Sequence, residues 1–168
     1  MLIRALTKND RQAWLTLAHE SDEIVGGLIP DIATFYEGFD DYMKSKIKQH
    51  EAFMAMDRMS EKCLGIVAFS KKHNRITFLA VTKDAEFQRV GGKLMEVALN
   101  QLGNTKEITV NVLMSDAELI KQERALYERF SFVESDNTIV ENGIPACQMK
   151  RPPIEIEERG RAKILQGL

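Results

Sequence analysis

The sequence has few cysteines, no long apolar run and no excess of basic residues. Its two cysteines, Cys63 and Cys147, lie far apart, which argues against a disulfide scaffold and favours reduced thiols in a cytoplasmic protein. No stretch approaches the ~18 consecutive apolar residues of a membrane span. Charge begins at Arg4, unlike in a signal peptide. With 23 Lys and Arg against 25 Asp and Glu, the net charge of −2 disfavours a general nucleic-acid binder.

The composition present is that of a folded domain. Of the 168 residues, 44% are hydrophobic and 29% charged, enough for a core and a solvated surface. Pro152-Pro153 ends the pattern of alternating elements, so we expect a single domain over residues 1–151 and a charged tail over residues 152–168. Internal repeats are absent.

Hydrophobic periodicity predicts helices and strands in a mixed order. Thr7 and Asp10 have the spacing of a capping box, which indicates a helix over about residues 8–18. A second helical stripe covers residues 32–47, and Gly38 either splits or bends it. The remaining expected elements are strands at 2–6, 52–56, 64–69, 76–81, 108–113, 132–133 and 146–149, and helices at 90–102 and 119–130. This order is that of an α+β fold, with helices on a largely antiparallel sheet.

The most informative segment is Phe78 to Leu102, where a strand, a glycine-bearing turn and a helix follow one another. Unpaired N–H groups at a helix start and a glycine that permits close approach can together hold a phosphate. An ordinary helix entry explains the same pattern. The spacing is neither that of a P-loop nor that of a dinucleotide fingerprint.

Residues 81–95 resemble the central motif of the GNAT acetyltransferase superfamily, a strand followed by Q/R-x-x-G-x-G/A and a helix. Gly91 lies at the last motif glycine, while Glu86 stands at the Gln/Arg position and Arg89 replaces the first glycine. A second register keeps Phe87-Gln88-Arg89 as the aromatic-Gln-Arg triplet. Residues 125–132 resemble the family's A-x-x-L-Y-E-K-x-G-F ending, and the order of elements over about residues 2–150 is the family's order.

The resemblance implies a GNAT-like fold, a sheet of about six to seven strands flanked by about four helices. It also implies an N-acetyltransferase that moves acetyl from acetyl-CoA to a primary amine, without a metal. Tyr127 would be the general acid that protonates the leaving thiolate; alternatively it only packs beside Phe130. The residues placed against acetyl-CoA are Leu79, Ala80, Val81, Phe87, Gln88, Arg89, Val90, Gly91 and Gly92.

The acceptor and the general base stay open at this stage. A small-molecule amine, a polyamine and a protein N-terminus are all compatible with the sequence, and a homodimer is possible. Thr77 is the one polar candidate on its strand; the acidic candidates are Glu23, Glu37, Asp40 and Asp41. The three histidines lack metal-ligand spacing. A non-catalytic acyl-CoA-binding or regulatory module on the same fold is the alternative function.

Overall fold

A seven-stranded sheet forms the centre of the protein in a computed structural model that describes residues 1–24, 32–141 and 143–154. The strand order is β1-β2-β3-β4-β5-β7-β6, and every neighbouring pair is antiparallel except the parallel pair β4 and β5. The strands are β1 (Leu2–Ala5), β2 (Ala52–Met56), β3 (Cys63–Ser70), β4 (Arg75–Val81), β5 (Ile108–Leu113), β6 (Val133–Glu141) and β7 (Ile144–Arg151). The helices are α1 (Arg11–Ile24), α2 (Ile32–Lys48), α3 (Phe87–Leu102) and α4 (Glu118–Arg129), with a 3-10 turn (Lys8–Asp10) before α1. The predicted fold class is confirmed.

Local sequence signals explain where several elements begin. The Asp10 carboxylate accepts a hydrogen bond from the Thr7 N–H at 2.8 Å, as the capping box predicts. It also accepts hydrogen bonds from the two terminal guanidinium nitrogens of Arg4, at 2.8 and 2.9 Å. Helix α2 runs unbroken through Gly38, which excludes a split, one of the two alternatives that the sequence left open there. The two late strands are longer than predicted, and β7 ends immediately before Pro152-Pro153.

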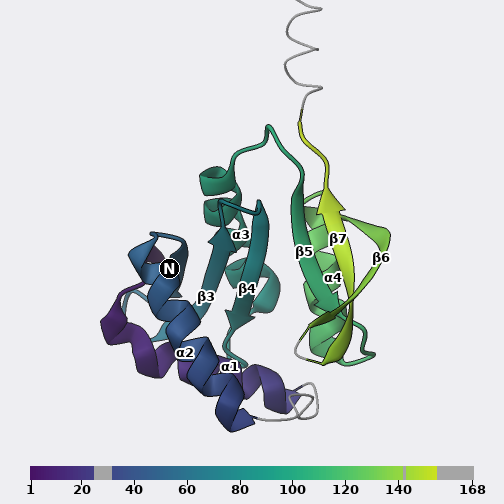
Figure 1. Cartoon of the computed structure of the whole chain (residues 1–168). Coiled ribbons are helices and arrows are strands. Elements are labelled where there is room, and N and C mark those ends of the chain that lie inside the picture. The colour runs from purple at the N-terminus through teal and green to yellow at the C-terminus, as the bar shows by residue number, and fades with distance from the viewer. Residues whose placement is uncertain (25–31, 142, 155–168) are drawn as a thin grey trace, which may run out of the picture.

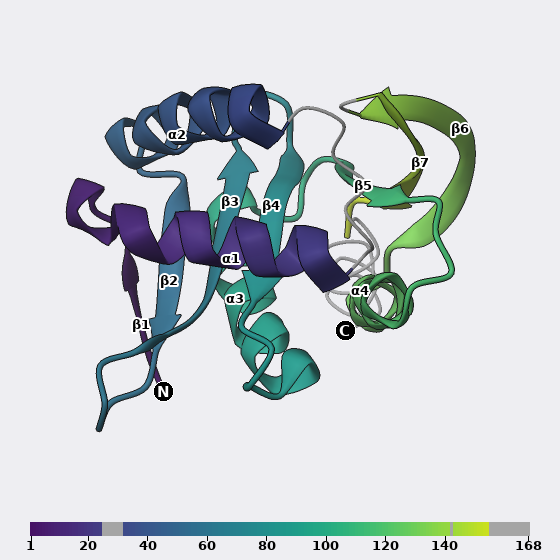
Figure 2. The ribbon, with the colours of Figure 1, turned by 90° about the horizontal axis from the view of Figure 1, so that it is seen from below.

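Helices cover both faces of the sheet, α1 and α2 on one and α3 and α4 on the other (Figure 1; Figure 2). The first face has a core centred on Trp14 and Met43, both fully buried. The larger core on the second face joins α3 and α4 through Leu94, Met95 and Leu126. No helix in the described part of the chain has the length and apolar character to cross a membrane.

Strands β4 and β5 separate soon after they pair, and this separation positions the candidate site. They share only the pairs Arg75 with Thr109 and Ile76 with Val110. The next residue, Thr77, is a β-bulge, because Ile76 pairs with Phe69 of β3 while Phe78 pairs with the adjacent Ala68. A bulge bends its strand and increases the local twist. Beyond Thr77, β4 stays with β3 while β5 stays with β7, and Figure 1 shows the two ribbons diverging.

The described start of the C-terminal tail remains attached to the domain. The Ile154 N–H donates to the Asn104 carbonyl at 2.8 Å, in the connection that follows α3. The rest of the predicted tail, residues 155–168, lies outside the described residues.

Candidate active site

Polar side chains gather where β4 and β5 diverge, on the face covered by α1 and α2. The hydroxyl of Tyr42, from α2, hydrogen-bonds to the hydroxyl of Thr77 at the bulge. On β5, Val110 and Val112 face the α3–α4 core, so by strand alternation Asn111 points to the opposite face of the sheet. The Asn111 Oδ1 is buried and has no hydrogen-bond partner among the described residues. This face therefore carries a buried acceptor without a donor.

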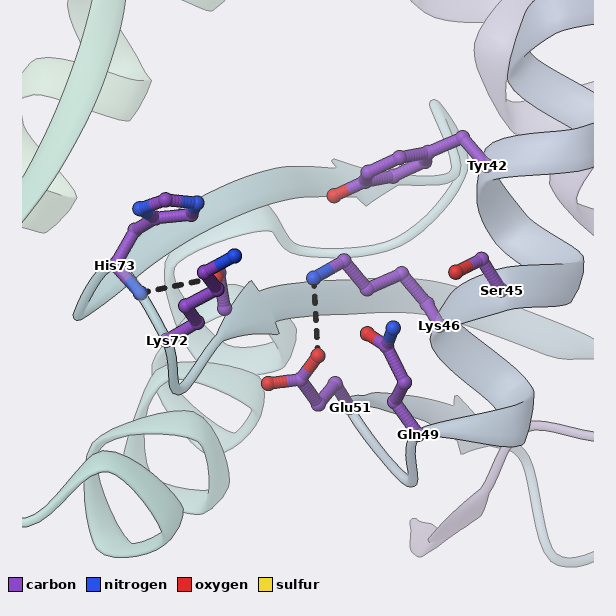
Figure 3. Close-up of a pocket in the computed structure, with 8 residues that line it drawn as sticks. Tyr42, Ser45, Lys46, Gln49, Glu51, Lys72 and His73 are labelled. Carbon is purple, nitrogen blue, oxygen red and sulfur yellow. Dashed lines mark hydrogen bonds and ion pairs between the residues drawn. The ribbon is translucent and has the colours of Figure 1, made fainter.

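A buried ion pair of Lys46 and Glu51 lies near Tyr42, at a pocket of about 440 Å³ (Figure 3). The Lys46 ammonium donates to Glu51 Oε1 at 3.1 Å and to the Phe69 carbonyl at 2.8 Å. It also lies 5.6 Å from the centre of the Tyr42 ring. The second Glu51 oxygen accepts the Lys71 N–H at 2.5 Å. These contacts fix the end of α2 to β3 and to the turn that leads into β4. The pocket is lined by Tyr42, Ser45, Lys46, Gln49, Glu51, Ser70, Lys72 and His73.

Tyr127 lies on α4, on the other face of the sheet. Its side chain is buried, with 4% of the residue exposed, and its ring packs 5.9 Å from that of Phe132. Burial raises the pKa of the Tyr127 hydroxyl well above 10, and the negative charges of Glu123 and Glu141 raise it further. Tyr127 therefore keeps its proton across the physiological pH range, as a proton donor must before it acts.

Two half-buried carboxyl groups interact electrostatically with Tyr127. Glu123 precedes it by one helical turn on the same side of α4, and burial, with the charge of Glu141, raises its pKa to about 8. Glu141 ends β6; burial raises its pKa, and the positive charge of Arg75 opposes that rise. Sequence reasoning missed both residues. The four-residue spacing of Glu123 and Tyr127 was a usable signal, whereas no local pattern marked Glu141.

At the start of α3, fewer backbone N–H groups are free to bind a ligand than the six residues 87–92 placed there from the sequence. Glu86 is the N-cap, and the Val90 N–H already donates to the Glu86 carbonyl at 3.1 Å. The N–H groups left at the helix start are those of Phe87, Gln88 and Arg89. The exposed side chains of Arg89 and Glu86 approach to 4.0 Å, so each offsets the charge of the other.

The two predicted loop glycines lie inside α3 and serve its packing. A Cβ on Gly91 would lie 2.8 Å from the Leu126 side chain of α4, and one on Gly92 would overlap the Arg129 guanidinium. That guanidinium donates to the Gln88 carbonyl at 3.1 Å. Small residues at these two positions therefore allow α4 to pack closely against α3.

The main chain of β4 past the bulge is paired on one side. Leu79, Ala80 and Val81 pair with β3, and no β5 residue pairs with them in the described ladder. This stretch therefore offers an unpaired strand edge towards β5, to which an extended ligand can add by main-chain hydrogen bonds.

Among the acids weighed from sequence, Asp40 has a structural role. It receives the indole N–H of Trp14 and the Nε of Arg11, both at 3.0 Å, and the Lys44 ammonium at 3.1 Å. Burial alone would raise its pKa, but these hydrogen bonds outweigh burial and lower it. Glu37 and Asp41 are exposed, and the side chain of Glu23 lies outside the described residues.

The cysteines and histidines do not form a second site in the part of the chain that is described. Both cysteines are free, and burial raises the pKa of the Cys63 thiol to about 11, which makes a thiolate nucleophile unfavourable. No group of three or more His, Cys, Asp or Glu side chains among the described residues could hold a metal ion.

Comparison with known proteins indicates one family. Residues 16–152 match the family described as acetyltransferase (GNAT) domain. No curated protein matches the chain. Among solved structures, a PaiA N-acetyltransferase from Thermoplasma acidophilum in complex with coenzyme A has a TM-score of 0.66 at 13% identity, covering 90% of this chain and 98% of that one.

Two further solved structures are of acetyltransferases that are named after their acceptors. A ribosomal-protein-alanine N-acetyltransferase from Brucella melitensis has a TM-score of 0.65 at 14% identity, covering 90% of this chain and 99% of that one. A spermidine N-acetyltransferase from Vibrio cholerae, in complex with CoA and spermine, has a TM-score of 0.62 at 15% identity, with coverages of 90% and 95%. At these identities the likeness establishes the fold.

Proposed function

This chain belongs to the GNAT acetyltransferase family, and we propose that it is an acetyl-CoA-dependent N-acetyltransferase whose acceptor is a primary amine. The observation that carries the proposal is the divergence of β4 and β5 immediately after the Thr77 bulge. It leaves a strand edge unpaired beside a buried tyrosine on one face and polar acceptors on the other. A donor and an acceptor substrate can thus meet from opposite faces of the sheet.

The residues present fit acetyl-CoA, which supplies the acetyl thioester. The free N–H groups of Phe87, Gln88 and Arg89, at the positive end of the α3 dipole, suit the pyrophosphate. The unpaired edge over residues 79–81 suits the pantetheine arm, and a main-chain N–H near Val81 would stabilise the oxyanion. The approach of Arg89 to Glu86 reduces the repulsion that the carboxylate would exert on a phosphate.

In this proposal the amine attacks the thioester carbonyl directly. Tyr127 then donates its hydroxyl proton to the sulfur as the carbon–sulfur bond breaks. The raised pKa of Tyr127 ensures that the proton is present at the start of the reaction. A cation bound near Glu141 would offset one of the charges that raise this pKa, and so would ease the transfer.

The first experiment measures acetyl-CoA binding by calorimetry in a matched pair of charge reversals. Arg89→Glu places a carboxylate at the start of α3, whereas Lys93→Glu makes the same change one turn further along, with side-chain exposures of 57% and 56% in the native protein. We expect Arg89→Glu to weaken binding roughly tenfold through charge repulsion, and Lys93→Glu to change it less than twofold. Equal losses in both variants would contradict a pyrophosphate site at the helix start.

The second experiment tests turnover. Release of the CoA thiol is followed with spermidine, a peptide with N-terminal alanine and small primary amines as acceptors. Mass spectrometry identifies the acetylated product. Saturable acetyl-CoA binding without acetylation of any amine would contradict the enzymatic proposal and favour a non-catalytic acyl-CoA-binding module.

A further inference from the structure

The pocket beside Tyr42 has no part in the acetyl-CoA site proposed above. The proposed contacts with acetyl-CoA lie at the end of β4, over residues 79–81, and at the start of α3. The pocket lies at the other end of β4, between the end of α2 and the turn that joins β3 to β4 (Figure 3). Its volume of about 440 Å³ is in the range of ~300–1,000 Å³ that is typical of small-molecule sites. The groups in its lining indicate which chemistry it can bind.

Basic side chains predominate in the lining of this pocket. Of its eight residues, Lys46, Lys72 and His73 are basic and Glu51 is acidic. Both oxygens of the acid already have partners within the protein. Oε1 accepts a hydrogen bond from the Lys46 ammonium at 3.1 Å, and Oε2 accepts one from the backbone N–H of Lys71 at 2.5 Å. The charge of Glu51 is therefore offset by Lys46, and the charge of Lys72 remains.

Lys46 is a buried cation in the wall of the pocket. Its side chain is 9% exposed, and that of Glu51 is 7% exposed. A buried ion pair is often no more stabilising than apolar side chains of the same volume, so its presence beside a cavity favours a role in binding. An ammonium group has three N–H donors. Among the described residues Lys46 uses two of them, to Glu51 and to the Phe69 carbonyl, which leaves one for a ligand.

The turn between β3 and β4 supplies donors from the opposite wall. Ser70 is buried, and its Oγ accepts the His73 N–H at 3.2 Å, while its own hydroxyl proton has no acceptor among the described residues. A histidine ring carries at least one N–H, and a lysine ammonium carries three. In Figure 3 the side chains of Lys72 and His73 lie across the pocket from that of Lys46. Donors from both walls therefore face one space.

The end of α2 adds few free acceptors to this space. The last carbonyl groups of a helix carry partial negative charge, which repels an anion unless they are satisfied. Here the carbonyls of residues 45–47 accept the N–H groups of residues 49–51 at 2.9 to 3.1 Å. Free donors thus outnumber free acceptors, an arrangement that suits the oxygens of a carboxylate or a phosphate.

Tyr42 connects the pocket to the point where β4 and β5 separate. It lines the pocket, and its hydroxyl donates a hydrogen bond to Thr77 at the bulge in β4. The pocket and the bulge therefore adjoin the same side chain. One molecule can place its amine where the strands separate and a second group in the pocket.

We propose that this pocket binds a carboxylate or phosphate group of the acceptor, so that the acceptor is an amine with an anionic group and not a polyamine. The proposal rests on the acetyltransferase function inferred above. Lys46, Lys72 and the hydroxyl of Ser70 donate hydrogen bonds to the anionic group. The second ammonium of a diamine would meet the charge of Lys72 and find no unpaired carboxylate in the lining.

The first test measures anion binding directly, with inorganic phosphate as the probe in an NMR titration of the full chain. Shifts at the amides of residues 70–73 report on the pocket, and shifts at residues 87–89 report on the start of α3. We expect Lys72→Gln to weaken the phosphate Kd at the pocket about fivefold or more, and Lys71→Gln to change it less than about twofold. Both lysines are exposed, but the side chain of Lys71 is not in the lining. Absence of shifts at residues 70–73, or equal losses in both variants, would overturn the anion site.

Lys72 is the position to change because its substitution leaves the buried pair intact. Removal of the Lys46 ammonium would leave Glu51 buried without its ion-pair partner, and such a change destabilises the fold itself. Melting temperatures of the Lys71→Gln and Lys72→Gln variants should both equal that of the native protein.

The second test identifies the source of the anionic group. A series of ω-amino carboxylates is compared as acceptors with the diamines of equal chain length. The native kcat/KM should be at least about tenfold higher for the amino carboxylates, and this ratio should fall about fivefold in Lys72→Gln through the KM. Lys71→Gln should keep the native ratio, and the acetyl-CoA Kd should stay within about twofold in both variants. Inorganic phosphate should inhibit competitively against the amine. Activation or non-competitive inhibition would assign the pocket to a separate anion and overturn its role in acceptor binding.

Failure of this inference can be told apart from failure of the function on which it rests. A native protein that binds acetyl-CoA but acetylates no amine, with or without an anionic group, contradicts the enzymatic function, and the acceptor class falls with it. A native protein that acetylates the diamines as fast as the amino carboxylates, with an unchanged ratio in Lys72→Gln, overturns this inference alone.

Discussion

At the scale of single residues, burial gives Tyr42 and Tyr127 higher pKa values than that of an ordinary phenol. Burial raises the pKa of Tyr42 to about 12, and that of Tyr127 is raised well above 10. Both hydroxyl groups therefore act as hydrogen-bond donors and neither as a phenolate. Tyr42 gives its hydrogen bond to Thr77 within the protein, so of these two phenols our proposal assigns Tyr127 to the sulfur.

Replacing Tyr127 by phenylalanine tests this division. The ring keeps its packing against Phe132, so we expect the melting temperature and the acetyl-CoA Kd to change little. The turnover number should fall about 100-fold, because only the proton donor is removed. Steady-state kinetics beside thermal denaturation provide the measurement. A kcat within threefold of the native value would limit Tyr127 to a packing role.

Glu123 makes the stability of the fold depend on pH. Its pKa is raised from 4.5 to about 8, so between these values the folded state binds more protons than the unfolded state. The free energy of unfolding therefore falls as pH rises from about 4.5 to 8 and receives no further change from this group above that range. A shift of this size corresponds to on the order of 3 kcal/mol after allowance for partial exposure.

Denaturant unfolding of Glu123→Gln at pH 5 and pH 8 measures this contribution. We expect the variant to lose less stability over this interval than the native protein, since glutamine does not titrate. Glu128→Gln, an exposed position on the same helix, is the matched control and should keep the native pH dependence. Parallel pH dependences in all three proteins would contradict the protonated state of the half-buried Glu123.

At the scale of elements, the sequence predicts what depends on local periodicity. The strand over residues 108–113 and the helices over residues 90–102 and 119–130 were located to within a few residues, because each buries one continuous apolar stripe. The capping box at Thr7 is likewise local. The bulge at Thr77 and the orientation of Asn111 arise from pairing between distant strands, which no sequence window contains.

The glycines of α3 illustrate the same limit. Sequence placed Gly91 and Gly92 in the phosphate loop because glycine permits close approach of a ligand. The structure shows that the group approaching them is α4, through Leu126 and Arg129. The close neighbour of both Cα atoms is therefore another helix, and helix–helix contacts are not encoded at a fixed spacing.

The same substitution in two helices tests this packing. Gly38 in α2 has open space around its Cα, so Gly38→Ala should stabilise the protein by about 0.5–1 kcal/mol through helix propensity. Gly91→Ala places a methyl group 2.8 Å from Leu126, and overpacking of this kind costs about 1–3 kcal/mol, which exceeds the same gain in propensity. Thermal denaturation should therefore show shifts of opposite sign. A stabilising effect at both positions would mean that Leu126 moves aside at little cost.

At the scale of the whole molecule, the sheet consists of two parts joined by a short seam. Strands β1 to β4 and strands β5 to β7 are each continuously paired, whereas β4 and β5 share two residue pairs. Across this seam, the packing of α3 on α4 through Gly91 and Leu126 provides a further connection. A ligand that pairs with the edge of β4 and contacts α4 would join the two parts more firmly.

This architecture predicts a large stabilisation by acetyl-CoA. At a concentration 100-fold above its Kd, a ligand that binds only the folded state adds about 2.7 kcal/mol. For a chain of this length that corresponds to a rise in melting temperature of about 5–10 °C. Hydrogen exchange should show new protection at the amides of residues 79–81 and at the start of α3. The β2–β3 ladder, which is already paired, should change little.

The Arg89→Glu variant shows whether this stabilisation depends on the start of α3. At the same acetyl-CoA concentration the variant should show a smaller rise, because a tenfold weaker Kd removes about 1.4 kcal/mol of linkage energy. Lys93→Glu should keep the native response, since its carboxylate lies one turn further along the helix. Protection confined to β1 and β2, or equal shifts in all three proteins, would place the ligand away from the seam. The separation of β4 from β5 would then be a feature of the fold without a part in binding.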